Sequence, residues 1–479
     1  MPLKVAWLPM YTPLDPAEEP PGSLDPLGTL NYAERLAEVL LPAFTVRMWR
    51  ARLLTFAAVA AVVADRTVVL MDGREDVRLE ARLAFERLFV SAMVRLAARD
   101  RDPENYGRAL PQLPGRDLAK RALLAREPLT RANFLKGQAV NGPFGVIARL
   151  ARQVELVDAD GHVGRSATSL LIAWSDDEKI PGVLDEDGPS ARAGAGWMND
   201  AVKATVTCLA KREWPGPSHR IWEQLALHLR SDQVGIGERR ELLQLLERAP
   251  VRRRFLGLLR DRVDLFREAR RTSDRGNVEK TVLLRGVRPE LGEDHVDRLI
   301  ADAISAVDTY EQTTSLLQQA FEGLIWGLKH WGGRATPKVV LGDDRLNRHL
   351  GQTRVALSKT VPRLDQAMSL LRNQPSLDKA QYVEPLARLR EDVVAAGTSE
   401  VALAQAVLNR HARVQREKAK APWIEGEAHW TLMPGENRVS GDAPPVWKDT
   451  YLHPFKVSNA YAILRDLGRI RLEDQDAAE

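Results

Sequence analysis

Apolar residues recur at three- and four-residue spacing through most of the chain, which predicts a mainly α-helical protein. The longest such pattern covers residues 293–331 and ends at the pair Gly332 and Gly333, which is typical of a helix end. The same spacing predicts further helices at residues 30–41, 46–64, 76–98, 218–230, 237–248, 251–271 and 457–467. Residues 345–372 are expected to be helical up to a kink at Pro362, and residues 383–420 to form a helix pair interrupted at Gly397. The fold class is therefore expected to be a multi-helix architecture.

Residues 130–180 depart from this helical pattern. Gly137 and Gly142 mark a turn between two short helices, the second of which begins at Pro143. Residues 154–157 are expected to form a strand, residues 158–161 a tight turn, and the chain from Val163 the return strand. Helix, turn, helix and hairpin in this order predict an embedded winged-helix-like unit. An apolar run at residues 170–174 is then expected to form another strand.

The last sixty residues combine aromatic residues with five prolines and predict a small α+β carboxy-terminal lobe. Residues 429–433 and 438–439 are expected to pair as strands, ahead of the final helix. The aromatic side chains favour a small core for this lobe, with base stacking as the alternative. The chain therefore divides into an N-terminal arm and helical domain, a winged-helix-like unit, a mobile loop, a second helical domain and an aromatic lobe. Their bounds are 1–118, 119–180, 181–205, 206–421 and 422–479.

Composition indicates an ordinary soluble protein, with 44% hydrophobic and 28% charged residues. Cys208 is the only cysteine, which excludes an intrachain disulfide and fits a cytoplasmic location. No apolar leader follows Met1, and the longest apolar run, residues 53–64, is shorter than the roughly 20 residues that a bilayer requires. We expect a buried helix there and no membrane contact.

Positive charge is concentrated in two places, although the whole chain carries a net charge of only +4. Residues 409–420 carry five cations and one acid, and residues 252–275 carry nine arginines and four acids. On a helix, four cations of the first stretch lie on the face opposite its apolar residues. Clustered cations on one face favour a polyanionic partner, whereas ion-paired, solvated helix faces are the alternative. The predicted phosphate-binding residues are Arg410, Arg413, Arg416 and Lys420, with Arg252, Arg253 and Arg254 as a second patch, and Arg149, Arg152 and Arg165 on the winged-helix-like unit.

The sequence contains none of the familiar catalytic motifs: no phosphate-binding P-loop, no dinucleotide fingerprint, no zinc-protease helix and no nucleophile elbow. The nine histidines have no metal-ligand spacing, so no metal or other cofactor is expected. The nearest approach to a metal-dependent nuclease is Asp158 with Asp177 and Lys179, beside the expected strand at 170–174. Whether the protein is an enzyme is left open, and the pattern favours a protein that is not.

Several carboxy-terminal motifs resemble a family of uncharacterised bacterial proteins. These motifs are Arg410-His411-x-x-Val414-Gln415-x-x-Lys418, Pro422-Trp423, Tyr451-x-His453-Pro454-Phe455 and Leu464-x-Asp466-Leu467. Leu135-Lys136-Gly137 and Ala320-Phe321 are similar as well, whereas the chain near Pro42 matches only loosely. The resemblance implies a setting in phage-defence neighbourhoods, beside helicases, methyltransferases or phospholipase-D-like nucleases, and it supplies no mechanism.

These observations predict a non-catalytic nucleic-acid-binding subunit of a bacterial anti-phage defence system. Its partners would be nucleic acid, DNA in the first place, and other defence proteins such as a helicase or nuclease. A protein–protein adaptor whose basic face docks on an acidic partner is the alternative. A divergent metal-dependent nuclease is the third hypothesis.

Overall fold

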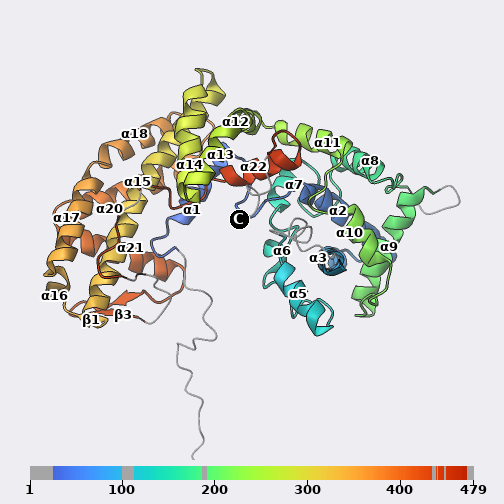
Figure 1. Ribbon diagram of the computed structural model, residues 1–479, viewed down its shortest axis with the longest axis horizontal. Helices are drawn as coiled ribbons and strands as arrows, with labels where there is room; N and C mark the ends of the chain where they lie inside the picture. Colours follow the sequence, from blue (N-terminus) through green and yellow to red (C-terminus); the bar gives the residue numbers. More distant parts are fainter. Residues whose placement is uncertain are drawn as a thin grey trace, which may run out of the picture. The chain divides into compact units, whose positions relative to one another are not determined.

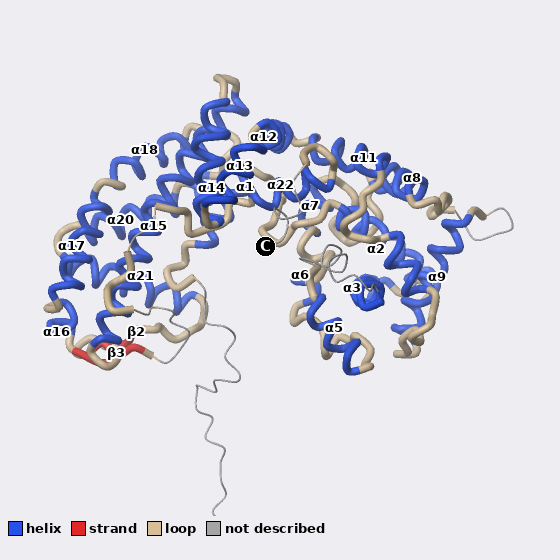
Figure 2. The backbone as a smooth tube through the Cα atoms, in the orientation of Figure 1, coloured by secondary structure: helices blue, strands red, loops and turns tan. Residues whose placement is uncertain are grey.

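The computed structural model describes residues 25–99, 113–185, 191–433, 439, 441–446 and 449–471 (Figures 1 and 2). It is mainly helical, as the spacing of apolar residues predicts, with one small antiparallel sheet. Backbone contacts divide the chain into two compact units, each assembled from two separate stretches. The first unit comprises residues 1–36 and 305–453, and the second comprises residues 37–304 and 454–479.

The second unit contains helices α2 to α14 and the last helix. Their bounds are α2 Arg52–Leu70, α3 Arg78–Arg99, α5 Arg116–Ala125, α6 Gln138–Asn141, α7 Ala148–Gln153, α8 Ala167–Asp177, α9 Ala193–Ala210, α10 Ile221–His228, α11 Ile236–Glu247, α12 Pro250–Asp261, α13 Val263–Thr272, α14 Arg275–Thr281 and α22 Val457–Asp466. Tighter or wider turns occur at Glu75–Val77, Arg288–Glu290 and the π-helical Val282–Val287. Helices α1 (Leu30–Leu40) and α15 (His295–His330) each belong partly to both units.

Helix α2 forms the core of the second unit, where it packs against α3, α8 and α9. By length and composition alone it is apolar enough to cross a membrane, yet 78% of its most apolar window is buried. This burial agrees with the expected core helix. The helix begins six residues later than predicted, at Arg52. Both Arg50 and Arg52 are buried and paired with carboxylates, which explains cations near a helix start that its dipole would otherwise disfavour.

Within the described residues, the helices of the first unit are the first part of α1, the part of α15 from residue 305 onward and six further helices. These are α16 Pro337–Leu341, α17 Asp344–Ser358, α18 Val361–Arg372, α19 Lys379–Tyr382, α20 Glu384–Ala396 and α21 Glu400–Glu417. Helix α20 packs on α18 and α21, and α17 packs on α21 (Figure 1). Long helix α15 confirms the predicted helix at 293–331, and Gly332 and Gly333 end it with left-handed backbone.

The sheet of the first unit has the strand order β1-β3-β2 and is antiparallel throughout (Figure 2). Strand β3 (Trp430–Leu432) confirms the strand expected at 429–433. Its partners are β1 (Arg334–Ala335) and β2 (Ile424–Glu425). Arg438 of the predicted partner strand 438–439 lies outside the described residues, and Val439 is not in a strand.

The winged-helix-like unit is not confirmed. Its hairpin is reduced to a single bridge between Val157 and Val163, closed by the expected turn at Asp158. The predicted strand at 170–174 is wrong, because these residues lie in α8. A short apolar run fits a buried helix as well as a strand, and the buried residues of α8 recur at i, i+3, i+4, i+7 and i+8, which is the spacing of one helix face.

Of the segment 181–205, predicted to be a mobile loop, residues 193–205 belong to α9 and residues 186–190 lie outside the described residues. One of its glycines, Gly194, allows close packing. A Cβ atom on Gly194 would lie only 2.3 Å from the carbonyl oxygen of Ile180. The same composition that is typical of flexible segments therefore allows α9 to approach the neighbouring backbone.

Gly115 precedes α5 with φ of +83°, and a Cβ there would lie 2.2 Å from the ring of Phe134. We expect Gly115→Ala to lower the free energy of unfolding by about 2–4 kcal/mol, from left-handed strain together with overpacking. Gly73 has φ of +72°, but no atom lies within 4 Å of the position that a Cβ would take there, so Gly73→Ala should cost only about 1–2 kcal/mol. Urea unfolding of both variants measures the difference, and equal losses would contradict the packing argument.

Candidate nucleic-acid interface

The four basic residues predicted on α21 occupy two different environments. Arg410 is mostly buried: its guanidinium donates to the Leu27 carbonyl at 2.9 Å and pairs with Asp392 at 2.6 Å. Arg413 is half exposed and shares the same carboxylate at 3.0 Å. Arg416 is exposed in the last turn of α21, and Lys420 is exposed in the chain beyond the end of this helix at Glu417. No ion pair holds either within the described residues. Cations at this end also stabilise the helix dipole.

The prediction that Arg410 faces solvent is therefore wrong, and the reason lies far away in sequence. Arg410 follows Val407 by three residues and Leu403 by seven, so helical spacing places it on the same side of α21 as these buried residues, and the expected opposite face is wrong. This side of the helix is covered by residues 25–29 of the same chain. A pattern within one helix carries no information about a chain segment that covers it.

The second predicted patch, on α12, also differs from the exposed cationic surface that a polyanion would require. Arg252 is 1% exposed and donates to the carbonyl groups of Leu246 and Pro42 and to Gln153. It cannot contact a phosphate without leaving the core, so its assignment is wrong. Burial lowers its pKa to about 10, which is still high enough to keep it charged at neutral pH.

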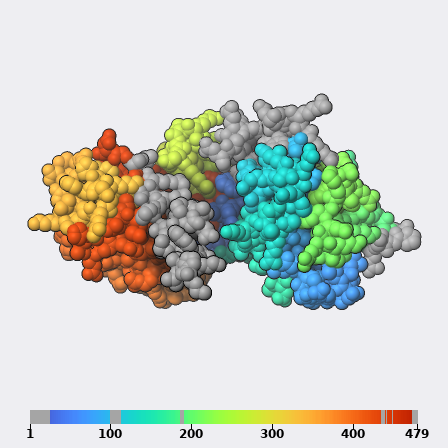
Figure 3. All heavy atoms as spheres, turned by 90° about the horizontal axis from the view of Figure 1, so that it is seen from below, coloured from blue at the N-terminus to red at the C-terminus, as the bar shows by residue number. Residues whose placement is uncertain are grey.

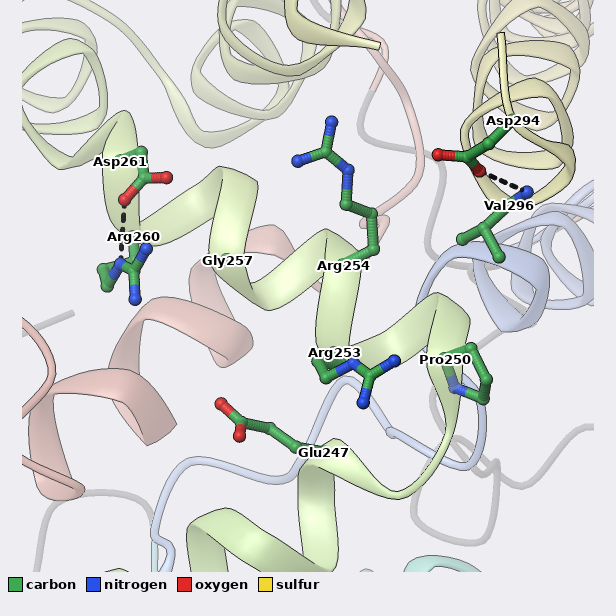
Figure 4. Close-up of a pocket in the computed structure, with 9 residues that line it drawn as sticks. All are labelled: Glu247, Pro250, Arg253, Arg254, Gly257, Arg260, Asp261, Asp294 and Val296. Carbon is green, nitrogen blue, oxygen red and sulfur yellow. Dashed lines mark hydrogen bonds and ion pairs between the residues drawn. The ribbon is translucent and has the colours of Figure 1, made fainter. Parts of the chain in front are cut away.

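A shallow pocket beside α12 contains the neighbouring arginines (Figure 4). Arg253, Arg254 and Arg260 leave the helix in different directions, and Arg254 is paired with Asp297 at 2.7 Å. Three acids line the same pocket, so its net charge is zero: Glu247, Asp261 and Asp294. These arginines diverge and are balanced by acids, which agrees with the alternative interpretation of this stretch as an ion-paired, solvated helix face.

The three arginines of the predicted winged-helix-like unit are all exposed. Arg149 pairs with Glu38 at 3.0 Å, and Arg165 binds the Glu155 carboxylate with two nitrogens. Arg152 has no ion-pair partner within the described part of the chain. Surface ion pairs of this kind contribute only about 0–1 kcal/mol each, so they hold these side chains weakly.

The residues of the nuclease hypothesis have structural roles. Asp158 accepts hydrogen bonds from the backbone of its own turn, whereas Asp177 accepts one from Glu238 N at the start of α11. Among the described residues, no group of three or more His, Cys, Asp or Glu side chains is placed to hold a metal ion.

A different site combines cations with aromatic rings, in a hollow of about 510 Å³ between α3, α5 and the loop before α10. Figure 3 shows the adjoining surfaces, with residues near α5 in cyan beside α9 and α10 in green. Three arginines and one acid among the lining residues give it a net charge of +2. The polar and aromatic lining residues include Arg95, Arg126, Arg212, Glu127, Trp214 and Trp222. We call it the Arg/Trp pocket.

Trp222 forms the floor of the Arg/Trp pocket. Its ring is 3% exposed and is fixed by a hydrogen bond from the indole nitrogen to the Gly216 carbonyl at 2.8 Å. The Arg95 guanidinium lies over this ring, 4.7 Å from its centre, in the geometry of a cation–π contact. Trp214 also lines the pocket and is half-buried.

Arg126 and Arg212 lie at the rim of the Arg/Trp pocket, where helices α5 and α9 end. Both are exposed, and no ion pair holds either within the described ranges. Their φ angles are +59° and +55°, a region that glycine usually occupies and that costs other residues roughly 1–2 kcal/mol. Such strain is common at binding sites. The arrangement presents two guanidinium groups and an aromatic edge to a ligand.

The sequence contains one local signal for this pocket, the unusual string Trp214-Pro215-Gly216-Pro217. Two prolines restrict the backbone beside an aromatic ring, which is typical of a binding loop. The remaining lining residues come from three other segments, and their convergence is visible only in the fold. A scan against protein-family models finds no matching family, and neither the curated proteins nor the solved structures searched contain a significant match.

Proposed function

We propose that this protein is a non-catalytic nucleic-acid-binding subunit that holds a single strand in the Arg/Trp pocket. The observation that carries the proposal is the combination of two exposed arginines with two tryptophans around one hollow. Proteins that bind single strands combine cationic groups, which contact phosphates, with aromatic rings on which bases stack. In this pocket Arg126 and Arg212 contact phosphates, and a base stacks on Trp214.

The setting comes from the resemblance of the carboxy-terminal motifs to proteins of bacterial phage-defence neighbourhoods. Within this proposal the protein is cytoplasmic and works beside a helicase or nuclease that supplies catalysis. Arg152, Arg253, Arg416 and Lys420 are exposed and add long-range attraction to a polyanion. The winged-helix interpretation of residues 119–180 stays a prediction, in which Arg152 contacts the backbone of a duplex.

Charge reversal tests the pocket directly. Arg126→Glu/Arg212→Glu should weaken binding of a fluorescein-labelled oligo(dT) by at least about tenfold at low salt, and lower the slope of log K against log salt by roughly 1.4, or 0.7 per lost contact. Trp214→Ala should cost about 1–3 kcal/mol of binding free energy through lost stacking. Fluorescence anisotropy across a salt series measures all three quantities.

The matched control is Arg121→Glu/Arg240→Glu, which reverses two exposed arginines of the same unit outside the pocket. If both double variants weaken binding equally, net charge and not the pocket binds the strand. If the wild-type protein binds no oligonucleotide at low salt, the proposal is wrong. Co-purification of an acidic protein that survives nuclease treatment and is lost on Arg126→Glu/Arg212→Glu would then support the adaptor function.

A further inference from the structure

The face of α21 that covers residues 25–29 has the features of a peptide-binding site. Five of its side chains contact this segment, at helix positions i, i+1, i+4, i+5 and i+8, which share one face. We call them the arm-binding face, and residues 25–29 the arm segment. The arm-binding face consists of Arg410, His411, Val414, Gln415 and Lys418.

The contacts are mainly with backbone carbonyl groups. Lys418 donates to the Asp25 carbonyl at 2.7 Å, and Arg410 donates to the Leu27 carbonyl at 2.9 Å. The Pro26 carbonyl accepts from His411 Nδ1 at 2.9 Å and from Gln415 Nε2 at 3.3 Å. Three successive carbonyl groups are thus bound in order along the helix, as in the recognition of an extended peptide.

His411 is held in one tautomer by this arrangement. Its Nε2 atom accepts a hydrogen bond from Trp423 N at 2.8 Å, so its Nδ1 atom carries the proton that is donated to Pro26. The side chain is fully buried, and burial lowers its pKa. The imidazole is therefore a fixed, neutral donor that belongs to the site and is oriented before the arm segment binds.

Two features make the site selective for its occupant. The Leu27 side chain is fully buried. Gly28 has φ of +67°, and a Cβ there would lie 2.7 Å from Val414 Cγ2. Beyond it, Thr29 is held by Tyr310, which donates to its carbonyl at 2.6 Å, and by His453 Nε2, 2.9 Å from its hydroxyl. An Asp-Pro-Leu-Gly-Thr peptide meets all these requirements.

We infer that the arm-binding face is an exchange site, in which the arm segment of a second copy of this chain can replace the chain's own. The arm segment and α21 belong to one compact unit, yet residues 37–304 separate the two stretches that form this unit. The contacts between the arm segment and α21 therefore do not require that both come from the same copy of the chain. A segment from another copy makes the same contacts, which is why exchange between protomers has a low cost.

Two complementary variants test the exchange. Copy A carries Gly28→Val, which prevents its arm segment from binding and leaves its arm-binding face intact. Copy B carries His411→Ala/Arg410→Ala, which removes hydrogen-bond donors from the arm-binding face and leaves its arm segment intact. With different affinity tags, A and B should co-purify after mixing, whereas A with A and B with B should not. Size-exclusion chromatography with light scattering should show a dimer only for the mixture.

A labelled peptide of residues 23–36 provides a second measurement that does not require copy B to fold. It should bind copy A at least about tenfold more tightly than wild type, because the wild-type segment competes at an effective concentration in the millimolar range. The same peptide with Gly28→Val should not bind. If the unaltered peptide binds neither copy A nor wild type at millimolar concentration, the inference is wrong. Neither outcome depends on oligonucleotide binding by the Arg/Trp pocket.

Discussion

Glu279→Ala should destabilise the second unit by about 3–5 kcal/mol, because three backbone N–H groups would lose their acceptor inside the protein. The Glu279 carboxylate is fully buried and accepts hydrogen bonds from Phe455 N at 2.7 Å, Val457 N at 3.3 Å and Ser458 N at 3.4 Å. It occupies the amino terminus of α22, where a negative charge is favoured.

Urea unfolding measures the expected loss, and Glu279→Gln is its matched control. Glutamine keeps one carbonyl acceptor of the same length, so it should lose roughly half as much stability as alanine. Amide hydrogen exchange at Phe455, Val457 and Ser458 should accelerate more than exchange in α3. A loss below about 1 kcal/mol for Glu279→Ala, or equal losses for both variants, would show that water replaces the carboxylate at little cost.

The reason for a large effect is that α22 holds several segments of the second unit together. Its Tyr461 hydroxyl donates to the Leu259 carbonyl at 2.9 Å, and the Tyr461 ring stacks on Phe266 with a centre distance of 3.8 Å. Asn459 donates to the carbonyl groups of Val46 and Met48, and Asp466 pairs with Arg50. Weakening the start of this helix therefore affects contacts on α12, α13 and the chain before α2.

The sequence predicts those parts of the fold that depend on local spacing. Helix α15 lies within one or two residues of its predicted bounds, and it continues through the polar residues 311–315, where a bend near Thr313 is the alternative. The predicted helix at 251–271 is instead two helices with a break at Arg262, whose φ of −117° is not helical. Spacing alone gives no sign of this break, since apolar residues continue at helical intervals across it.

The candidate sites depend on contacts between distant segments, which spacing does not reveal. Charge clustering groups Arg410 with Lys420, yet Arg410 is covered by the arm segment, whereas Lys420 is exposed beyond the end of α21. Likewise, nothing local connects Arg95 with Trp222, whose contact forms the floor of the Arg/Trp pocket. Charge clustering identifies where cations are numerous, whereas burial and pairing decide which of them are available to a ligand.

Arg52→Met should have a similarly large effect, which depends on pH. Arg52 is 1% exposed and lies 2.8 Å from both Glu178 and the fully buried Glu238. Removing it leaves a buried carboxylate without its cation, which costs about 3–5 kcal/mol when the carboxylate is charged. Burial already raises the pKa of Glu238 to about 7 in the presence of Arg52, and loss of the arginine raises it further.

The direction of the pH dependence follows from this raised pKa. Because folded Glu238 holds its proton more tightly than unfolded Glu238, its contribution to stability is fully present below pH 4.5 and is lost as pH rises through 7. In Arg52→Met the loss continues to higher pH. The stability difference between wild type and variant should therefore be smallest near pH 5 and grow above pH 7 by up to about 1.4 kcal/mol per pH unit.

Urea unfolding of both proteins across this pH range measures the difference, with Arg52→Met/Glu238→Gln as the matched control. The double variant has no titrating carboxyl at position 238, so its unfolding free energy should change less between pH 5 and pH 8 than that of Arg52→Met. The Thr55 hydroxyl, which donates to Glu238 at 2.5 Å, keeps an acceptor in the glutamine side chain. A penalty for Arg52→Met that is the same at both pH values would show that lost packing, and not the uncompensated charge of Glu238, destabilises the variant.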